Sequence, residues 1–325
     1  MKIGSFEFDT PMILAPMAGV TDKPFRLLCR ELGADIAVSE MIKANDQLYD
    51  SEKTRLRTDH SGEPGPRSVQ ILGNDPAQMA HAAKLNADQG ADIIDINMGC
   101  PAKKVCKKAA GSALLAEPTL VGEILDAVVN AVNIPVTLKI RTGTDDDQIN
   151  AVEIGQIAQA AGVQALAIHG RTRAQKFTGN AEYYTIKAVV EALDIPVLAN
   201  GDIDTPHKAE QVLAETGCAG LLIGRAAQGN PWIFREIKHY LQTGVTLPAP
   251  DNDQLRDVLI RHLQALPGFY GDFKAPLIAR KHIGWYASGK PGAQEFRQKI
   301  NQLNNIDAQI ELVCDYLATT WGAAA

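Results

Sequence analysis

A single cysteine followed by a cluster of lysines is the part of this sequence best suited to chemistry. Cys100 stands in the segment 95–104, directly after an apolar run that predicts a buried strand. The Asn, Gly and Pro residues of the segment predict a tight turn, which would place the thiol at the carboxyl end of the strand, where barrel enzymes keep reactive groups. A thiol beside positive charges suits a polyanionic substrate, with RNA as the first candidate, although a buried structural cysteine is the ordinary alternative. The charges come from Lys103, Lys104, Lys107 and Lys108.

Short apolar runs alternate eight times with longer helical patterns, which predicts an α/β protein with a closed (β/α)8 TIM barrel. An open doubly wound sheet is the competitor, but the segment 15–19 after the first strand lacks the expected G-x-G-x-x-G pattern. The predicted strands are Met12–Ala15, Asp35–Ser39, Ser68–Leu72, Ile93–Ile96, Val136–Ile140, Ala165–Ile168, Val197–Ala199 and Gly220–Ile223. The predicted helices include Pro76–Gln89, Thr119–Val132, Ala151–Ala161, Tyr183–Leu193 and Pro206–Thr216.

The pattern changes after Arg225. Pro231–Leu241 is predicted to be the eighth helix, and Thr246–Pro250 a short linker. The remaining sequence predicts only helices, at 253–266, 274–287, 293–303 and 307–319. We therefore expect a barrel domain at 1–245 and a small all-α domain at 246–325.

The bulk composition excludes several classes of protein. The chain has a formal net charge of −6 and 46% hydrophobic residues, so it is not a globally basic nucleic-acid binder. Five scattered cysteines without zinc-ligand spacing predict a reduced protein with no metal site. No signal peptide, membrane span or obligate protein partner is indicated, so a cytoplasmic location is expected. The segment 271–299 holds six basic and two acidic residues around Trp285 and Tyr286, which suits RNA contact and equally suits an ordinary helix surface.

The predicted strand ends collect polar residues that could form one site. Parallel strands of a barrel end at the same mouth, so these side chains should converge there. Gly201 and Gly224 would let backbone N–H groups approach a phosphate, and Arg225 adds charge. Lys139 and Gln70 could reach the polar edge of a ring over the barrel centre, which suits flavin mononucleotide (FMN). The polar residues at the strand ends are Glu40, Gln70, Asn97, Cys100, Lys139, Arg141, His169, Arg171, Asn200, Asp202 and Arg225.

The same residues resemble the bacterial tRNA-dihydrouridine synthases, close to their B-type (nitrogen-regulation-like) subfamily, over essentially the whole chain. The matching stretches are Ala15–Asp22, Val69–Ile71, Asp95–Pro101, Leu138–Arg141, Ile168–Arg171, Ala199–Asp202, Ile223–Arg225, Ala279–His282 and Trp285. The resemblance implies FMN as cofactor, NADPH as reductant and the elbow of tRNA as partner, with a D-loop uridine, position 17 in this subfamily, as the target. It implies Cys100 as the proton donor, and Asn97 and Arg141 as contacts of the flipped uracil. The implied FMN residues are Pro16, Met17, Ala18, Gln70, Lys139, His169, Asn200, Gly201, Asp202, Gly224 and Arg225.

Two points qualify the resemblance. Position 106 is commonly Asn in relatives but is Cys106 here, so any amide contact from this loop is in doubt. A thiol near pKa 8.5 is a usable acid at neutral pH, but the nearby lysines should lower that pKa until RNA phosphates neutralise them. The alternatives are an FMN barrel that acts on a free pyrimidine, like dihydroorotate dehydrogenase, and a non-catalytic RNA-binding regulator.

Overall fold

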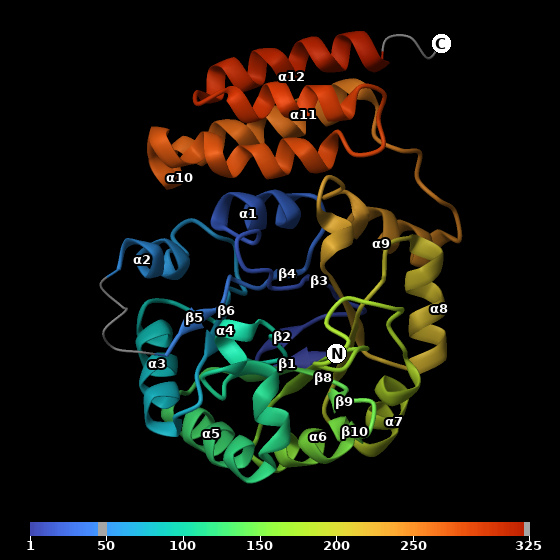
Figure 1. Ribbon diagram of the computed structural model, residues 1–325. Coiled ribbons are helices and arrows are strands. Elements are labelled where there is room, and N and C mark those ends of the chain that lie inside the picture. The colour runs from blue at the N-terminus through green and yellow to red at the C-terminus, as the bar shows by residue number, and fades with distance from the viewer. Residues whose placement is uncertain (45–50, 322–325) are drawn as a thin grey trace.

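Parallel strand segments curl into one closed sheet in the computed structural model, which describes residues 1–44 and 51–321 (Figure 1). Neighbouring segments pair in the order β4, β3, β13, β12, β11, β8, β7, β6, β5. The two ends of this order meet, because Val38 forms a parallel bridge with Ser68 and the Ser39 N–H donates to the Ser68 carbonyl at 3.0 Å. The predicted barrel is therefore confirmed. The segments are β3 (Met12–Leu14), β4 (Ile36–Ala37), β5 (Ile42–Lys43), β6 (Ser68–Leu72), β7 (Ile93–Met98), β8 (Val136–Arg141), β11 (Ala165–His169), β12 (Val197–Asn200) and β13 (Gly220–Ile223).

The second barrel strand differs from its prediction. One strand was expected at 35–39, but the chain forms β4 beside β3 and then β5 beside β6. Between them the Ser39 hydroxyl accepts a 3.0 Å hydrogen bond from the Gln70 N–H, and Glu40 accepts one from the Gly19 N–H. The side chains of Ser39 and Glu40 thus accept hydrogen bonds from backbone N–H groups where the chain passes from pairing with β3 to pairing with β6.

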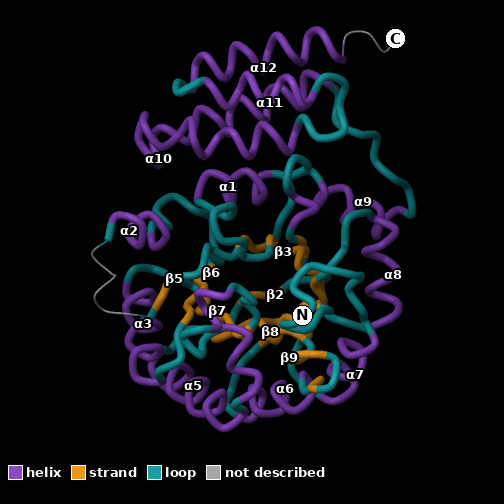
Figure 2. Tube along the Cα trace, viewed as in Figure 1, coloured by secondary structure: helices purple, strands orange, loops and turns teal. Residues whose placement is uncertain are grey.

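Helices cover the outer face of the barrel (Figure 2). Several begin with a proline after a capping side chain; for example, Asp75 accepts a 2.8 Å hydrogen bond from the Gln78 N–H at the start of α3. Among residues 1–44 and 51–321, no helix is both long and apolar enough to cross a membrane. The outer helices are α1 (Lys23–Glu31), α2 (Glu52–Thr58), α3 (Pro76–Asp88), α5 (Pro118–Ala131), α6 (Ala151–Ala160), α7 (Tyr184–Ala192), α8 (Pro206–Thr216) and α9 (Ile233–Thr243).

Alternation along each strand separates the core from the site. On β7, Ile94, Ile96 and Met98 belong to the large apolar cluster shared with the helices, while Asp95 and Asn97 take the alternate positions. A second apolar cluster joins residues of several strands with Ile3 of the hairpin formed by β1 (Lys2–Ile3) and β2 (Phe6–Glu7). Shorter elements lie in the strand–helix connections: α4 (Lys103–Cys106), η2 (Gly111–Ala116), β9 (Gly143–Asp145), β10 (Gln148–Ile149) and η3 (Arg225–Ala227).

The carboxyl-terminal helices form a layer beside α1 (Figure 1). They are α10 (Asn252–Tyr286), α11 (Ala293–Gln302) and α12 (Ile306–Trp321). Two helices were predicted at 253–266 and 274–287, and the range of α10 covers both; a kink at Gly271, whose φ of 75° is not helical, separates the two helical parts. Glycine adopts this backbone conformation without steric cost, so the chain can change direction between the two helical parts. That residues 246–325 form a separate domain stays a prediction.

Candidate functional site

A cavity of about 1010 Å³ opens at the carboxyl ends of the barrel strands. This volume lies at the upper end of the range typical of ligand sites, about 300–1,000 Å³. Every residue that the sequence predicted for cofactor, substrate or catalysis lines it, although the first and last of them, Pro16 and Arg225, are 209 positions apart in the sequence. The lining residues among those predicted are Pro16, Met17, Ala18, Gln70, Asn97, Cys100, Lys139, Arg141, His169, Asn200, Gly201, Asp202, Gly224 and Arg225.

A hydrogen-bonded network of polar side chains forms the floor of this cavity. The register pairs Gln70 with Asp95 and Asn97 with Lys139 on neighbouring strands. The Gln70 amide donates to Asp95 Oδ2 at 2.7 Å and accepts from Asn97 Nδ2 at 2.8 Å, and the Thr137 hydroxyl donates to Asp95 Oδ1 at 2.7 Å. Burial raises the pKa of Asp95 to about 6, although the hydrogen bonds from Gln70 and Thr137 act to lower it. The network fixes Gln70 and Asn97 in single orientations below the cavity.

Cys100 is held by its backbone from two sides. Asn97 Oδ1 accepts hydrogen bonds from the N–H groups of Gly99 at 3.2 Å and Cys100 at 3.0 Å. The Cys100 carbonyl accepts from the Ser112 hydroxyl at 2.9 Å and from the Ser112 N–H at 3.1 Å. The thiol itself belongs to a partly exposed side chain that faces the cavity. The strand end and the η2 turn therefore set the direction of this thiol.

The protonation of Cys100 differs from the sequence-based expectation. Burial raises the pKa of its thiol, and the lowering effect of Arg141 and Lys139 is smaller. The four lysines of the α4 region are exposed to solvent, which screens their charges. Cys100 is thus a protonated thiol at neutral pH even without a polyanion beside it.

The side chain of Cys106 contacts the backbone of Cys100. Its Sγ lies 3.6 Å from the Cys100 carbonyl oxygen and 3.7 Å from the Ser112 hydroxyl. A thiol is only a weak hydrogen-bond donor, so these contacts are weaker than those an amide could make. The firm support of this loop comes from Ser112 instead.

Lys139 places an ammonium group in the cavity wall. Its Nζ donates a 2.9 Å hydrogen bond to Asn200 Oδ1, and Asn200 Nδ2 donates to the Leu222 carbonyl at 2.9 Å. Burial, together with the charge of Arg141, lowers the pKa of Lys139 to about 8. An anionic group bound in the cavity would favour the charged form of this lysine.

Arg141 lies two residues after this lysine on β8, and His169 lies opposite Arg141 on the neighbouring strand β11. Burial and the surrounding cations lower the pKa of His169 to about 2, so its imidazole is neutral. Arg141, which is 2% exposed, donates from Nε to the Gly99 carbonyl at 2.8 Å and from Nη1 to the carbonyls of Thr172 at 2.9 Å and Lys176 at 2.8 Å. It therefore ties the Cys100 turn to the loop after β11. The polar atoms of Asn97 and Arg141 described so far bond to protein, and their predicted contact with substrate stays a prediction.

A glycine follows each of β12 and β13, and the second of them has open space beside it. Gly201 has a φ of 120°, and a Cβ there would lie 2.8 Å from Ala181 Cβ. A Cβ at Gly224 would meet nothing closer than Met17 Sδ at 3.8 Å, so the space beside this glycine is open. Asp202 binds Arg171 through two hydrogen bonds of 3.0 and 2.6 Å and Arg225 through one of 2.9 Å. The carboxylate of Asp202 thus orients the guanidinium groups of Arg171 and Arg225.

Sequence reasoning missed one cavity residue with an unusual setting. Phe177 is 55% exposed, and its ring centroid lies 5.5 Å from the Arg141 guanidinium carbon and 5.4 Å from that of Arg225. A flat aromatic face at a cavity mouth can stack on another ring. The signal available in the sequence was a single aromatic residue within a polar loop after a strand, which by itself has little specificity.

The residues present fit a mononucleotide flavin. The cavity offers open space over Gly224, an exposed guanidinium at Arg225 for a phosphate, and a buried ammonium group at Lys139 for the electron-rich edge of the ring. Within the described residues, no group of three or more His, Cys, Asp or Glu side chains could hold a metal ion. A parallel (β/α)8 barrel with convergent polar side chains at this end defines the class of the protein as a barrel enzyme.

Comparison with known proteins identifies the family. The model of the family "Dihydrouridine synthase (Dus)" matches residues 13–320, and the chain belongs to this family. It is 58% identical over 318 residues to tRNA-dihydrouridine synthase B of Pseudomonas aeruginosa, covering 98% of this chain and 96% of that protein. It is 54% identical over 316 residues to the protein of the same name from Vibrio parahaemolyticus, covering 97% and 98%. The chain is accordingly an enzyme of the B-type group, a flavin-dependent oxidoreductase.

A solved structure supports the fold alone. The complex of 2-naphthoyl-CoA reductase with 2-naphthoyl-CoA matches with a TM-score of 0.58 at 12% identity. The match covers 74% of this chain but only 51% of that one, so the chain spans about half the length of the reductase. This likeness carries no argument about substrate.

Proposed function

We propose that this enzyme reduces the C5–C6 double bond of a uridine in the D-loop of tRNA, with FMN as its flavin and NADPH as its reductant. The observation that supports the proposal best is that a protonated thiol, Cys100, and a buried ammonium group, Lys139, face one cavity. Reduction of a uracil ring needs a hydride at C6 and a proton at C5. When bound, FMN supplies the hydride, so the protein has to supply the proton and the alignment.

Cys100 is the proposed proton donor. Its thiol is acidic enough to give up a proton in the transition state and is protonated at neutral pH, which is the state an acid must start from. Asn97 and Ser112 hold its backbone, and Arg141 holds the adjoining Gly99 carbonyl. We assign Asn97 and Arg141 to substrate contact as well, since both line the cavity beside Cys100.

The proposed FMN residues divide into three groups by position. Pro16, Met17 and Ala18 line the cavity from the β3–α1 connection, while Gln70, Lys139, His169 and Asn200 line its floor and wall. Gly201, Asp202, Gly224 and Arg225 surround the proposed phosphate position, where Asp202 orients Arg225. The neutral His169 can donate or accept one hydrogen bond to a ligand without adding charge.

A folded tRNA must present its uridine to this cavity. Flipping the base out of its loop costs a few kcal/mol, which phosphate contacts must offset. The exposed lysines Lys103, Lys104, Lys107 and Lys108 lie next to Cys100 in sequence and are proposed to bind phosphates there. The helices of residues 246–325 are proposed as a second contact surface for the tRNA elbow, and the cytoplasm as the place of reaction.

The test is to map dihydrouridine by mass spectrometry after incubating the protein with NADPH and tRNA from cells that lack dihydrouridine. A single D-loop uridine should gain two mass units with the unchanged protein and not with Cys100→Ala. Cys314→Ala removes a partly exposed thiol on α12 and should leave the product unchanged. Turnover of free uridine or dihydroorotate without any tRNA product would contradict the RNA substrate and favour a free pyrimidine.

A further inference from the structure

The connection between β3 and α1, residues 15–22, separates the cavity from the carboxyl-terminal helices. We call it the β3–α1 loop. Pro16, Met17, Ala18 and Val20 of this loop line the cavity. Within the loop, the N–H groups of Val20 and Thr21 both donate to the Met17 carbonyl at 3.0 Å. These local bonds make a compact turn, but contacts from outside the loop must fix its position over the cavity.

Helix α10 makes two such contacts. The Tyr270 hydroxyl donates a 2.8 Å hydrogen bond to Asp22 Oδ2, and the Lys281 ammonium group donates to the Gly19 carbonyl. Asp22 is 2% exposed and its other oxygen accepts from the Phe25 N–H at 3.0 Å, capping α1. One contact reaches the side chain of Asp22 at the end of the loop, and the other reaches the backbone of Gly19 at its tip, although 248 residues separate Tyr270 from Asp22.

The backbone of Gly19 also has a second partner. Its N–H donates to Glu40 Oε1, the same oxygen that accepts a 2.9 Å hydrogen bond from Arg57 Nη2. The backbone of Gly19 therefore bonds to Glu40 through its N–H and to Lys281 through its carbonyl. Removal of either partner would leave the tip of the loop attached on one side only.

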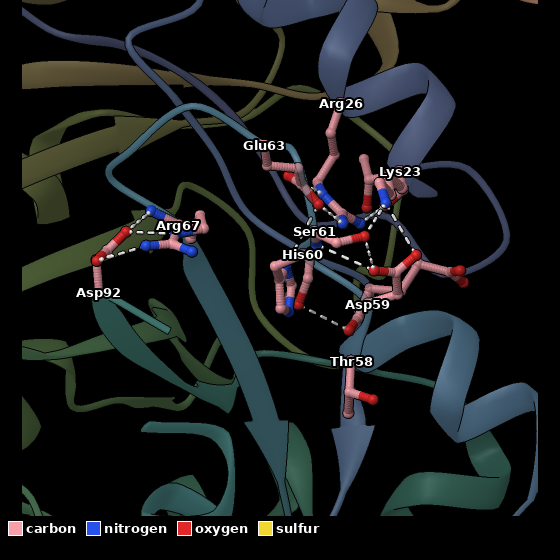
Figure 3. Close-up of polar contacts among 12 residues, drawn as sticks. Lys23, Arg26, Thr58, Asp59, His60, Ser61, Glu63, Arg67 and Asp92 are labelled. Carbon is pink, nitrogen blue, oxygen red and sulfur yellow. Dashed lines mark hydrogen bonds and ion pairs between the residues drawn. The ribbon is translucent and has the colours of Figure 1, made fainter. Parts of the chain in front are cut away.

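Helix α1 has an independent attachment, so its place does not depend on Tyr270. Lys23 Nζ donates to Asp59 at 2.9 Å and to Ser61 at 2.8 Å, and Arg26 binds Glu63 through two hydrogen bonds (Figure 3). Loss of the Tyr270 contact is therefore expected to loosen the loop in front of α1 and not the helix itself.

Helix α10 also contacts the loop after β13, which flanks the proposed phosphate position. A Cβ at Gly229 would lie 2.7 Å from the backbone C and O atoms of Trp285, so the two backbones are in close contact. The neighbouring Gln228 lines the cavity, and its Nε2 lies 3.7 Å from Met17 Sδ. One helix thus supports both loops that border the cofactor end of the cavity.

We propose that Tyr270 and Lys281 are positioning residues for the flavin, so that the carboxyl-terminal helices complete the cofactor site as well as contacting RNA. The inference rests on the proposed function, because it requires the flavin to bind against the β3–α1 loop. Tyr270 and Lys281 act through Asp22 and Gly19 and do not touch the flavin themselves.

The experiment measures the FMN dissociation constant of the full-length protein from flavin fluorescence, for the unchanged protein, Tyr270→Phe and Lys281→Met. Loss of one such hydrogen bond should weaken FMN binding about fivefold or more. Excess FMN should restore kcat while KM for tRNA stays unchanged, which a general loss of folding would not allow. Tyr316→Phe is the matched control, since its hydroxyl donates at 2.8 Å to the Pro291 carbonyl within the helical layer. This control should change FMN affinity by less than about twofold.

Two outcomes would overturn the inference. If the unchanged protein binds FMN and both α10 variants bind it within about twofold of that affinity, the flavin site does not depend on α10 and only this inference fails. If the unchanged protein binds no FMN, the proposed function fails and the inference falls with it. Melting temperatures of all four proteins show whether a variant has lost its fold.

Discussion

The ammonium group of Lys139 on β8 donates a 2.9 Å hydrogen bond to the amide oxygen of Asn200 on β12, with β11 lying between the two strands. Asn200 in turn donates to the Leu222 carbonyl on β13. Because a neutral amide cannot neutralise the ammonium charge, burial lowers the pKa of Lys139 to about 8. A cation in this state binds an anionic partner more strongly than a solvated lysine would, since less water has to be removed.

The low pKa of Lys139 predicts that FMN binding weakens in mild alkali. The charged form of a lysine exists below its pKa, so the charge is lost as pH rises through about 8. FMN affinity should fall by up to about tenfold per pH unit above that value. Titration of the protein with FMN from pH 7 to 9.5 measures this. Lys139→Met should bind FMN weakly at every pH. If the FMN affinities of Lys139→Met and of the unchanged protein changed with pH in parallel, the assignment of Lys139 to the cofactor site would be contradicted.

Cys100→Ser should abolish product formation while leaving the flavin bound. A serine hydroxyl is far too weak an acid to replace the thiol, and loss of a general acid costs about 10²–10⁴-fold in rate. Flavin content by absorbance and dihydrouridine by mass spectrometry measure the two effects separately.

Since burial raises the pKa of the Cys100 thiol, its protonated form should persist above the pH at which Lys139 loses its charge. If activity fell near pH 8 even with saturating FMN, this order of the two pKa values would be contradicted.

Binding of tRNA should depend strongly on salt through the exposed lysines near Cys100. The double variant Lys104→Ala and Lys108→Ala should reduce the slope of log affinity against log salt by about 2. Filter binding or fluorescence anisotropy at several salt concentrations gives the slope. The control pair Lys84→Ala and Lys187→Ala removes exposed lysines from the outer helices α3 and α7 and should leave the slope unchanged. Equal slopes for both pairs would remove the α4 region from the interface.

His262→Phe should stabilise the protein increasingly as pH falls. His262 is 2% exposed, stacks near Phe25 and has no hydrogen-bond partner for either ring nitrogen among the described residues. Burial, with the charge of Lys281, lowers its pKa to about 3, so the folded state resists protonation while the unfolded state accepts it below about 6.5. Stability from this group is therefore present above pH 6.5 and lost as pH falls.

The expected difference between His262→Phe and the unchanged protein grows by about 2 kcal/mol between pH 7 and pH 5. Urea unfolding at the two pH values measures it. His239→Phe alters a partly exposed histidine on α9 and serves as the control, which should show no comparable growth. A constant difference across this range would mean that His262 takes up protons in the folded protein as it does in the unfolded one.

Periodicity and strand-end chemistry were sufficient to predict the barrel and the residues of its mouth. Parallel strands place their carboxyl ends together whatever their separation in sequence, so Cys100, Lys139 and Asn200 could be brought to one site by topology alone. The same reasoning gave the outer helices to within a few residues, because proline and capping side chains mark their starts locally.

Other features depend on contacts between distant segments, which local sequence does not reveal. The division of the second strand follows from hydrogen bonds to two different neighbours, and the direction that the chain takes across the kink at Gly271, between the two helical parts of α10, follows from tertiary packing. The raised pKa of the Cys100 thiol reflects burial, which composition does not reveal. The sequence by itself determined which elements form and which chemical groups meet at the barrel mouth, because both depend on local periodicity and on strand direction. Only the tertiary structure decided how Tyr270, Asp22 and Lys281 meet, since side-chain contacts between distant segments depend on packing that no local pattern encodes.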